Sequence, residues 1–241
     1  MAKYRMLLIN DLRHILKDPM LMVSLLGPMA IIAFARFAFP LLSEWIEQQY
    51  TFDLSVYTDF TVIFLLVIVT LLPGTMAGLL MLDERDENII AYYAVTPLAR
   101  NGYLYYRMFL PSLLSLLLTT LFFSLSGIAK IQMESGYTLV LLALEAPCIA
   151  LLLTAFAANK VEGLALSKAN GLLIAGPIVV SFVPESWQFL GMWVPTFWPA
   201  KCYIAGISNE PLIALGSFGV GFVFHVILLM VLIRSFSKRI D

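Results

Sequence analysis

Residues 60–82 read FTVIFLLVIVTLLPGTMAGLLML, a stretch that contains no charged side chain. A helix needs roughly 20 predominantly apolar residues to cross the hydrocarbon core of a bilayer, so this stretch is long enough to span a membrane. The whole chain is biased in the same way, because 61% of its 241 residues are hydrophobic and only 13% are charged. A soluble domain of this length could not bury so much apolar surface. The sequence therefore predicts an integral membrane protein.

Further apolar stretches divide the chain into six predicted transmembrane helices, which together form a single membrane domain covering residues 1–241. We place these helices at residues 20–42, 56–82, 107–128, 138–158, 169–183 and 211–234. The number of Lys and Arg residues is small and the net charge is only -1, so no basic patch is available for nucleic acid. The predicted fold class is therefore an all-α integral membrane protein.

Residues 3–18 precede the first span and are predicted to form an amphipathic helix that lies on the membrane surface. Leu8, Leu12 and Ile15 would share one face, whereas Arg13 and Lys17 would lie on the other, which is the pattern of an interfacial helix. The Asp-Pro pair that follows ends this helix, because a residue before proline disfavours helical geometry.

The fifth predicted span, residues 169–183, is unusually short. At about 1.5 Å per residue it would reach only roughly 22 Å, less than the thickness of the hydrocarbon core. The segment that follows contains Trp187, Trp193 and Trp198 together with two prolines. We predict that it is a re-entrant external hairpin that completes the outer half of the molecule. The alternative is an interfacial loop that its tryptophans anchor to the headgroup layer.

The distribution of basic residues predicts the orientation of the chain. With a cytoplasmic N-terminus, twelve basic residues fall on the inner side: Lys3, Arg5, Arg13, Lys17, Arg85, Arg100, Arg107, Lys160, Lys168, Arg234, Lys238 and Arg239. Only Lys130 and Lys201 fall on the outer side, and Lys and Arg favour the cytoplasmic side. We therefore predict a multi-pass protein of the bacterial inner or plasma membrane with both termini in the cytoplasm.

The most informative segment is the predicted cytoplasmic loop at residues 83–106. It begins with the charged sequence DERDE at residues 83–87, which cannot lie in lipid. The apolar run IIAYYAV at residues 89–95 follows and is far too short to cross a bilayer; its large side chains include Ile89, Ile90, Tyr92 and Tyr93. One interpretation is a short helix that rests on the membrane. The other is a docking helix that inserts into a groove of a cytoplasmic protein.

This loop resembles the E-R-E-x-G-T-x-E-x-L-x-x-T-P-L-S-R loop of type-two ABC exporter permeases, in which the stretch is the coupling helix. The residues that carry the match are Glu84, Arg85, Thr96, Pro97 and Arg100. Two positions depart from the pattern, because Asn stands at 88 where the family usually has Gly, and Ala stands at 91 where it often has Glu. The basic N-terminal helix, the six spans and the external hairpin extend the resemblance over the whole chain.

The resemblance implies that the chain is the membrane-spanning permease subunit of an ATP-binding cassette exporter. Such a subunit would move a hydrophobic or amphipathic substrate, such as a drug, peptide or lipid, outward. The chain has no G-x-x-x-x-G-K-[ST] phosphate loop, so it is not predicted to be an enzyme, and no metal or cofactor is expected on it. ATP and Mg would bind to two cytoplasmic ABC ATPase subunits beneath a permease homodimer or heterodimer. The loop residues named above would form the ATPase-coupling surface.

Two charged residues fall inside predicted spans, where charge is costly and usually finds a partner or a cavity. Arg36 and Glu145 lie at similar depths in the first and fourth spans, so they could form an ion pair. The pair could be structural or could line the outer part of a pathway; alternatively, Arg36 could extend outward to the membrane surface. His225 lies in the sixth span, which contains no acidic residue, and we expect it to be a neutral packing residue.

Two rival functions have weaker support in the sequence. An intramembrane serine protease would need its nucleophile and base within about 3 Å, whereas Ser126 and His225 are predicted at different depths. An ion-gradient-driven secondary transporter or channel would need acidic residues at a central site. Glu145 is the one candidate, and its predicted position is off centre. The dependence of transport on ATP and a partner ATPase separates these alternatives.

Overall fold

A computed structural model describes residues 8–9, 11, 13, 15–50, 52–94 and 99–240. Within these residues the secondary structure is helical, with no strand. Six helical segments are long and apolar enough to cross a membrane: Leu21–Tyr50, Leu54–Asp86, Asn101–Leu125, Ser135–Phe156, Lys160–Phe182 and Pro211–Lys238. The all-helical fold and the number of spans agree with the sequence prediction. Half of the predicted surface helix at residues 3–18 lies outside the described residues, so that helix stays a prediction.

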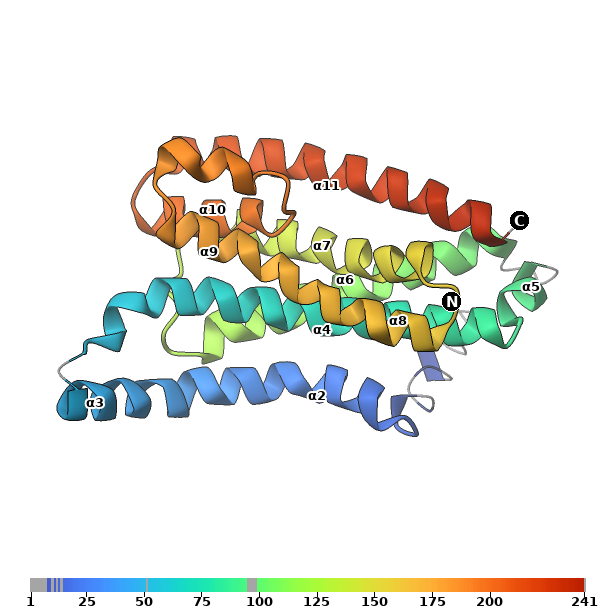
Figure 1. Ribbon diagram of the computed structural model, residues 1–241, viewed down its shortest axis with the longest axis horizontal. Coiled ribbons are helices and arrows are strands. Elements are labelled where there is room, and N and C mark those ends of the chain that lie inside the picture. The colour runs from blue at the N-terminus through green and yellow to red at the C-terminus, as the bar shows by residue number, and fades with distance from the viewer. Residues whose placement is uncertain are drawn as a thin grey trace.

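The α-helices of these six segments and the two shorter helices outside them, α5 and α10, are named as in Figure 1. They are α2 (Pro19–Ala33), α3 (Phe39–Tyr50), α4 (Thr58–Asp86), α5 (Ile89–Ala94), α6 (Ala99–Leu125), α7 (Ser135–Phe156), α8 (Lys160–Ser167), α9 (Ala175–Phe182), α10 (Phe197–Ile207) and α11 (Pro211–Ile240). A π-helical turn, Phe34–Ala38, joins α2 to α3. Its wider geometry has a local cause: Pro40 has no N–H and its ring would clash with the carbonyl of Arg36 in a regular helix.

The centre of the bundle is formed by α4 and α7, which are mostly buried, whereas a third or less of each other span is buried. Gly74 and Gly78 let these two helices approach closely. A Cβ atom on Gly74 would lie 2.7 Å from the Ala146 backbone oxygen, and one on Gly78 would lie 3.0 Å from the Ala150 oxygen. The two residues have the GxxxG spacing, in which small residues allow helices in membranes to pack closely.

The fifth span is longer than the sequence predicted. The helical path begins at Lys160 in α8, continues through a 3₁₀ segment at Lys168–Ile174 and ends at Phe182 in α9. Asn159 caps its start, because its side chain accepts a hydrogen bond from the Glu162 N–H at 2.9 Å. The polar residues of α8 lie between two of the predicted spans, and they form a helix that packs beside the end of α4.

The segment after α9 folds back onto the bundle at one end. A 3₁₀ turn at Glu185–Gly191 leads to α10, which packs against α7, α9 and α11. Trp187 and Trp193 are exposed, whereas Trp198 is buried and donates its indole N–H to the Met192 carbonyl at 3.1 Å. The three tryptophans of the predicted hairpin therefore have different roles, and membrane re-entrance of this segment stays a prediction.

The two ends of the elongated molecule carry different elements (Figure 1). The last turns of α11, the start of α2 and the short helix α5 lie at one end, called here the α5 end, while α3 and α10 lie at the other. Large apolar side chains are exposed on the sides between the ends, for example Val23, Leu26, Leu215, Val223 and Ile227. An apolar outer surface is what a lipid solvent requires.

Candidate functional site

The charged sequence at the end of α4 forms the centre of the candidate site. We call Asp83, Glu84, Arg85 and Asp86 the α4 hub. Successive residues of a helix are rotated by about 100° from one another, so four consecutive side chains point in different directions. They therefore bind three different parts of the chain: Glu84 binds Arg107, Arg85 binds the end of α7, and Asp83 and Asp86 both bind Lys160. The hub therefore joins α4 to several parts of the chain at the α5 end.

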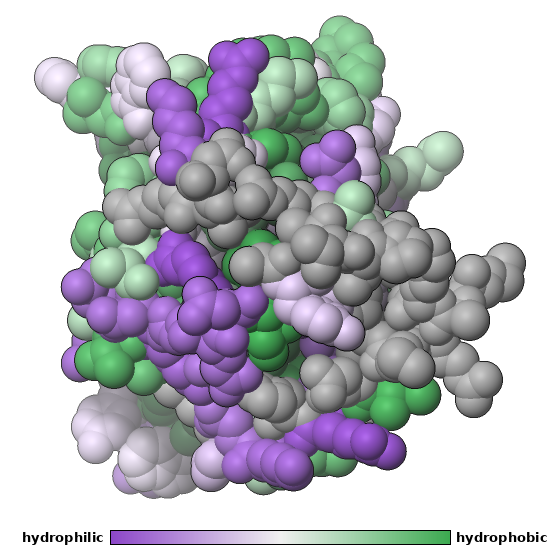
Figure 2. Space-filling model, turned by 90° about the vertical axis from the view of Figure 1, so that its right-hand side faces the viewer, coloured by the Kyte–Doolittle hydropathy of each residue, from purple (hydrophilic) through white to green (hydrophobic). Residues whose placement is uncertain are grey.

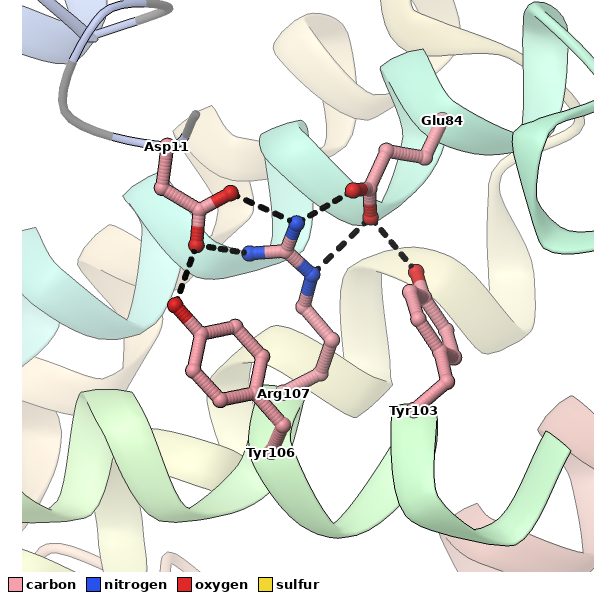
Figure 3. Close-up of polar contacts among 5 residues, drawn as sticks. All are labelled: Asp11, Glu84, Tyr103, Tyr106 and Arg107. Atoms are coloured by element: carbon pink, nitrogen blue, oxygen red, sulfur yellow. Dashed lines mark hydrogen bonds and ion pairs between the residues drawn. The ribbon is translucent and has the colours of Figure 1, made fainter. Parts of the chain in front are cut away.

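Glu84 belongs to a buried polar cluster, called here the Arg107 cluster, whose members are Asp11, Glu84, Tyr103, Tyr106 and Arg107 (Figure 3). The Arg107 guanidinium donates to both oxygens of Asp11 at 2.8 Å. It also donates from Nε to Glu84 Oε2 at 2.9 Å and from Nη2 to Glu84 Oε1. One cation thus binds two carboxylates in the forked geometry that makes Arg–carboxylate pairs strong.

Two tyrosines complete this cluster. The Tyr103 hydroxyl donates to Glu84 Oε2 and the Tyr106 hydroxyl donates to Asp11 Oδ2, both at 2.7 Å. The guanidinium carbon of Arg107 also lies 5.7 Å and 5.4 Å from the centres of the two rings. These donors matter because the cluster holds two carboxylates and one guanidinium, and buried charges need full hydrogen bonding.

The other hub residues bind the ends of α7 and α8. Arg85 donates to the Thr154 carbonyl at 3.0 Å and to the Ala157 carbonyl at 2.6 Å, which satisfies acceptors that the C-terminus of α7 would otherwise leave open. Asp83 pairs with the Lys160 ammonium at 2.6 Å, and Asp86 accepts from the Lys160 backbone N–H at 2.9 Å. Lys160 also binds Asp18 at 2.9 Å, which adds the start of α2 to the same network.

A sharp turn at Asn88 separates the hub from α5. Asn88 has φ = 57°, a left-handed conformation that Gly adopts freely and that Asn tolerates better than most residues. Its N–H donates to the Arg85 carbonyl at 3.0 Å, as in the left-handed caps that end helices. Asn88 can therefore do here what the Gly of the resembling family's pattern would do.

Helix α5 has an inner and an outer face. Ile90 is 3% exposed and packs in the core, and the ring of Tyr93 stacks on Tyr103 with 5.6 Å between centroids. Burial, followed by the negative charge of Glu84, raises the pKa of Tyr93, so its hydroxyl stays neutral near pH 7. Tyr92 points away and is 68% exposed. Tyr92 is therefore a large, exposed aromatic side chain on a helix whose other face packs against the bundle through Ile90 and Tyr93.

The predicted coupling residues thus divide into internal and external ones. Glu84 and Arg85 bind groups within the chain, and their part in ATPase coupling stays a prediction. Ile90 and Tyr93 attach α5 to the bundle, and Tyr92 faces outward. Ile89 is partly exposed. Thr96 and Pro97 lie outside the described residues, as does the side chain of Arg100.

Sequence reasoning missed the partners of Glu84. The sequence places Arg107 among the basic residues near span ends and indicates no role for Asp11, Tyr103 or Tyr106. The spacing of Tyr103, Tyr106 and Arg107, at i, i+3 and i+4, places them on one face of a helix, and this pattern could have indicated a shared polar partner. It could not have identified Asp11, because that contact joins distant parts of the chain.

The surface at the α5 end differs from the apolar sides. Figure 2 looks onto this end and shows hydrophilic side chains gathered around the residues drawn in grey, with hydrophobic ones between them. Among the residues that the structure describes, no group of three or more His, Cys, Asp or Glu side chains could hold a metal ion. The α5 end thus has the exposed side chain of Tyr92 above the buried Arg107 cluster. An exposed aromatic side chain on a rigid support is suited to contact with another protein.

The predicted pairing of Arg36 with Glu145 does not form. Glu145 Oε2 lies 2.7 Å from Nε2 of His225 on α11, and both side chains are buried. Arg36 is exposed, and its guanidinium lies beside Gly127 in the segment between α6 and α7. The π-helical turn changes the direction of Arg36 relative to a regular helix, which similar depths in the sequence could not reveal. The acidic partner of His225 comes from another helix.

The family model described as "Fluoroquinolones export permease protein Rv2686c-like" matches residues 11–233. Two relatives from Mycobacterium tuberculosis are each 28% identical over 237 residues, which is 95% of this chain and 92% of theirs. They are the fluoroquinolones export permease proteins MT2760, of strain CDC 1551 / Oshkosh, and Rv2686c, of strain ATCC 25618 / H37Rv. No solved structure matches the chain.

Proposed function

Because the chain belongs to the family of Rv2686c-like fluoroquinolone export permeases, we propose that it is the membrane subunit of an ATP-driven exporter. In this proposal the energy comes from two separate ABC ATPase subunits, which bind ATP and Mg and dock at the α5 end. The central helices α4 and α7 of one copy pack against each other. We therefore propose that the pathway lies between two permease copies, which are identical or related.

The observation that carries the proposal is the outward face of α5. Tyr92 is 68% exposed, and exposed aromatic side chains on a fixed support are typical anchors of protein interfaces. Beneath it, Tyr93 stacks on Tyr103, whose hydroxyl binds Glu84. A partner that grips α5 would therefore hold a helix that is joined to α4 and α6 by packed and ionic contacts.

These contacts give a physical route for transmitting movement. Packed cores and ionic networks shift as units and do not deform smoothly. If closure of the ATPases displaced α5, the hub would carry the displacement into α4, and Arg85 and Asp83 would pass it to α7 and α8. The same displacement would reach the N-terminal segment through Asp11. The spans could then open a pathway toward the outside.

The distribution of charge supports a cytoplasmic position for the α5 end. Arg85, Arg107 and Lys160 belong to the network at this end, while Lys130 and Lys201 lie in segments of the opposite end. Basic residues favour the cytoplasmic side of a membrane. We therefore place both termini and the α5 end in the cytoplasm and the α10 end outside.

We propose a hydrophobic or amphipathic cargo. The apolar and aromatic composition of the spans favours such a molecule over a long polar polymer, and the names of the two relatives make a fluoroquinolone the first compound to test. An aromatic drug of this class is partly apolar and partly charged, so it can partition into a bilayer interface before export.

The test uses Tyr92→Asp with Tyr50→Asp as a matched control. Tyr92 and Tyr50 are 68% and 67% exposed, but Tyr50 lies in α3 at the opposite end of the molecule. We expect Tyr92→Asp to reduce copurification of the ATPase by about tenfold, since losing an interface anchor costs at least about 1.4 kcal/mol. Tyr50→Asp should leave copurification unchanged. Equal copurification in both variants and the parent protein would refute docking on α5.

A second candidate function is an ion-gradient-driven secondary transporter or channel. The observation that favours it is the buried Glu145–His225 pair, because intramembrane acid–histidine pairs occur in proton relays. Reconstituted protein distinguishes the two candidates. Export in vesicles that requires the ATPase and ATP supports the first, and export by the chain alone along a proton gradient supports the second.

A further inference from the structure

A buried acid and a histidine meet halfway along the central helix α7 and the outer helix α11. Glu145 lies near the middle of α7, and His225 lies near the middle of α11. Their side chains are 1% and 0% exposed, and Glu145 Oε2 lies 2.7 Å from His225 Nε2. The other ring nitrogen, Nδ1, lies 2.7 Å from the Gly221 carbonyl oxygen. Both imidazole nitrogens therefore have a polar partner within the protein.

This geometry fixes the number of protons that the pair holds. A carbonyl oxygen only accepts hydrogen bonds, so Nδ1 carries a hydrogen and donates it to Gly221. The short contact between Nε2 and Oε2 then requires exactly one further hydrogen, because two lone pairs at this distance would repel each other. That hydrogen is either on the carboxyl oxygen or on the imidazole. In both cases the pair as a whole is electrically neutral.

Losing or gaining a proton would leave a net charge in a dry interior. A carboxylate facing an unprotonated Nε2 would be an uncompensated anion, and a protonated carboxyl beside an imidazolium would be an uncompensated cation. Charges of either kind are expensive away from water. The contact between α7 and α11 is therefore stable only while the pair holds this one bridging proton.

Among the residues that the structure describes around the pair, none supplies a second charge that could replace this proton. Residues 60–82 of α4 and 108–125 of α6 contain no titratable side chain. On α7, the neighbouring titratable groups are Tyr137, which stacks on Phe218, and the buried Cys148. On α11, residues 212–233 contain no other titratable side chain.

The remaining helix in contact with both α7 and α11 is α10, and its three titratable groups have partners elsewhere. Lys201 binds Glu185 and Gln188, Cys202 lies 3.6 Å from the Ala214 carbonyl, and the Tyr203 hydroxyl accepts from the Lys130 N–H. None of these contacts involves the pair. Its protonation is thus decided by Glu145 and His225 themselves.

We propose that Glu145 and His225 form a binding site for one proton inside the membrane domain, and that this proton fastens α11 to α7. The site is closed in the present conformation, because both side chains are shielded from solvent. Any step that separates the two helices must hydrate the groups and expose the proton to exchange. The site would act in this way whichever energy source drives export.

The first test reads the position of the proton directly. The chain contains two histidines, so His14→Gln leaves His225 as the only imidazole for ¹⁵N NMR in lipid bilayers. We expect Nδ1 to be protonated and the Nε2 signal to stay constant between about pH 6 and 8, the range in which an ordinary histidine changes charge. In Glu145→Gln the amide donates to Nε2, so the Nε2 signal should be that of an unprotonated nitrogen, and its difference from the parent signal tells whether the bridging hydrogen lies on the imidazole or on the carboxyl. An ordinary histidine titration of the parent between about pH 6 and 8 would overturn the proposal.

The second test uses Cys148 as a native reporter of opening. It lies one turn from Glu145 on α7 and is 2% exposed, and Cys202→Ser leaves it as the only thiol. With N-ethylmaleimide we expect Glu145→Ala to react at least about tenfold faster than the parent, because local opening exposes the thiol. Glu145→Gln, which keeps the hydrogen bond, should react like the parent. Equal rates in all three proteins would show that the bridge does not fasten α11.

Discussion

Arg107 shows how one side chain can decide whether a buried charge is tolerated. Its guanidinium binds Asp11 and Glu84 at once and is 2% exposed. A lysine could not reproduce this contact, because its ammonium lacks the planar fork that matches a carboxylate. The tyrosines that donate to the same carboxylates supply the hydrogen bonds that a single cation leaves open. The cluster is thus a complete ionic unit, and removing one member exposes the others to an apolar interior.

We predict that Arg107→Ala strongly destabilises the protein. Two buried carboxylates would lose their cation, which costs about 3–5 kcal/mol for a broken buried pair. The midpoint temperature of thermal unfolding in detergent should fall by about 10 °C. Arg234→Ala is the control, because Arg234 is an exposed arginine on α11, and its midpoint should change little. A similar loss in both variants would contradict the role of the cluster.

A prediction about Arg85 separates internal from external contacts. Because Arg85 binds the carbonyls of Thr154 and Ala157, Arg85→Gln should lower stability by about 1.5–3 kcal/mol, the value of hydrogen bonds to charged groups. Its affinity for the ATPase, measured on protein that remains folded, should be unchanged. Tyr92→Asp should show the opposite behaviour, with normal stability and weak ATPase binding. Loss of affinity with normal stability in Arg85→Gln would indicate direct contact with the partner.

The helices α4 and α7 act as the structural axis on which the remaining spans are assembled. Their close contact depends on Gly74 and Gly78, and their ends are joined by Arg85. The surrounding helices have long apolar faces that need lipid or another protein as cover. Elements therefore differ in their freedom to move: α4 and α7 are fixed on most sides, whereas α2 and α11 have one packed face each. The proposed proton bridge lies at the contact between a fixed helix and a freer one.

We predict that Gly74→Ala weakens the α4–α7 contact. The added methyl carbon would lie 2.7 Å from the Ala146 backbone oxygen, so the helices must separate at a cost of about 1–3 kcal/mol. Gly171→Ala is the matched control, because a Cβ there would meet nothing within 4 Å. Thermal unfolding in detergent should therefore show a lower midpoint for Gly74→Ala alone. Identical midpoints for the two variants would mean that the contact is more adaptable than the structure indicates.

The molecule as a whole is polarised between its two ends. The α5 end holds the buried ionic networks and the exposed face of Tyr92, while the opposite end holds α3, α10 and exposed tryptophans. The apolar flanks between them fit a lipid environment. This polarity is what an exporter driven from one side would need, since a soluble motor can act on one end and cargo can leave at the other.

A cysteine-labelling experiment checks the proposed orientation. Met133 lies between α6 and α7 and is 95% exposed, and Val161 lies at the start of α8 and is 74% exposed. On intact cells, a membrane-impermeant maleimide should label Met133→Cys and should label Val161→Cys only after permeabilisation. The two native cysteines are buried, so their background should be low. Labelling of Val161→Cys alone on intact cells would show that the orientation is the opposite of the proposed one.

The sequence by itself determined the solvent, the all-helical class and the number of spans, because apolar stretches of sufficient length have few other stable states in a membrane. It also indicated α5 as a short apolar helix outside the spans. Only the tertiary structure decided the partners of the polar residues. Glu84 meets Arg107, and Glu145 meets His225 in place of Arg36, because side-chain direction depends on how the helices rotate and pack. Hydropathy is a local property of the chain, whereas a buried ion pair joins residues whose distance only packing can set.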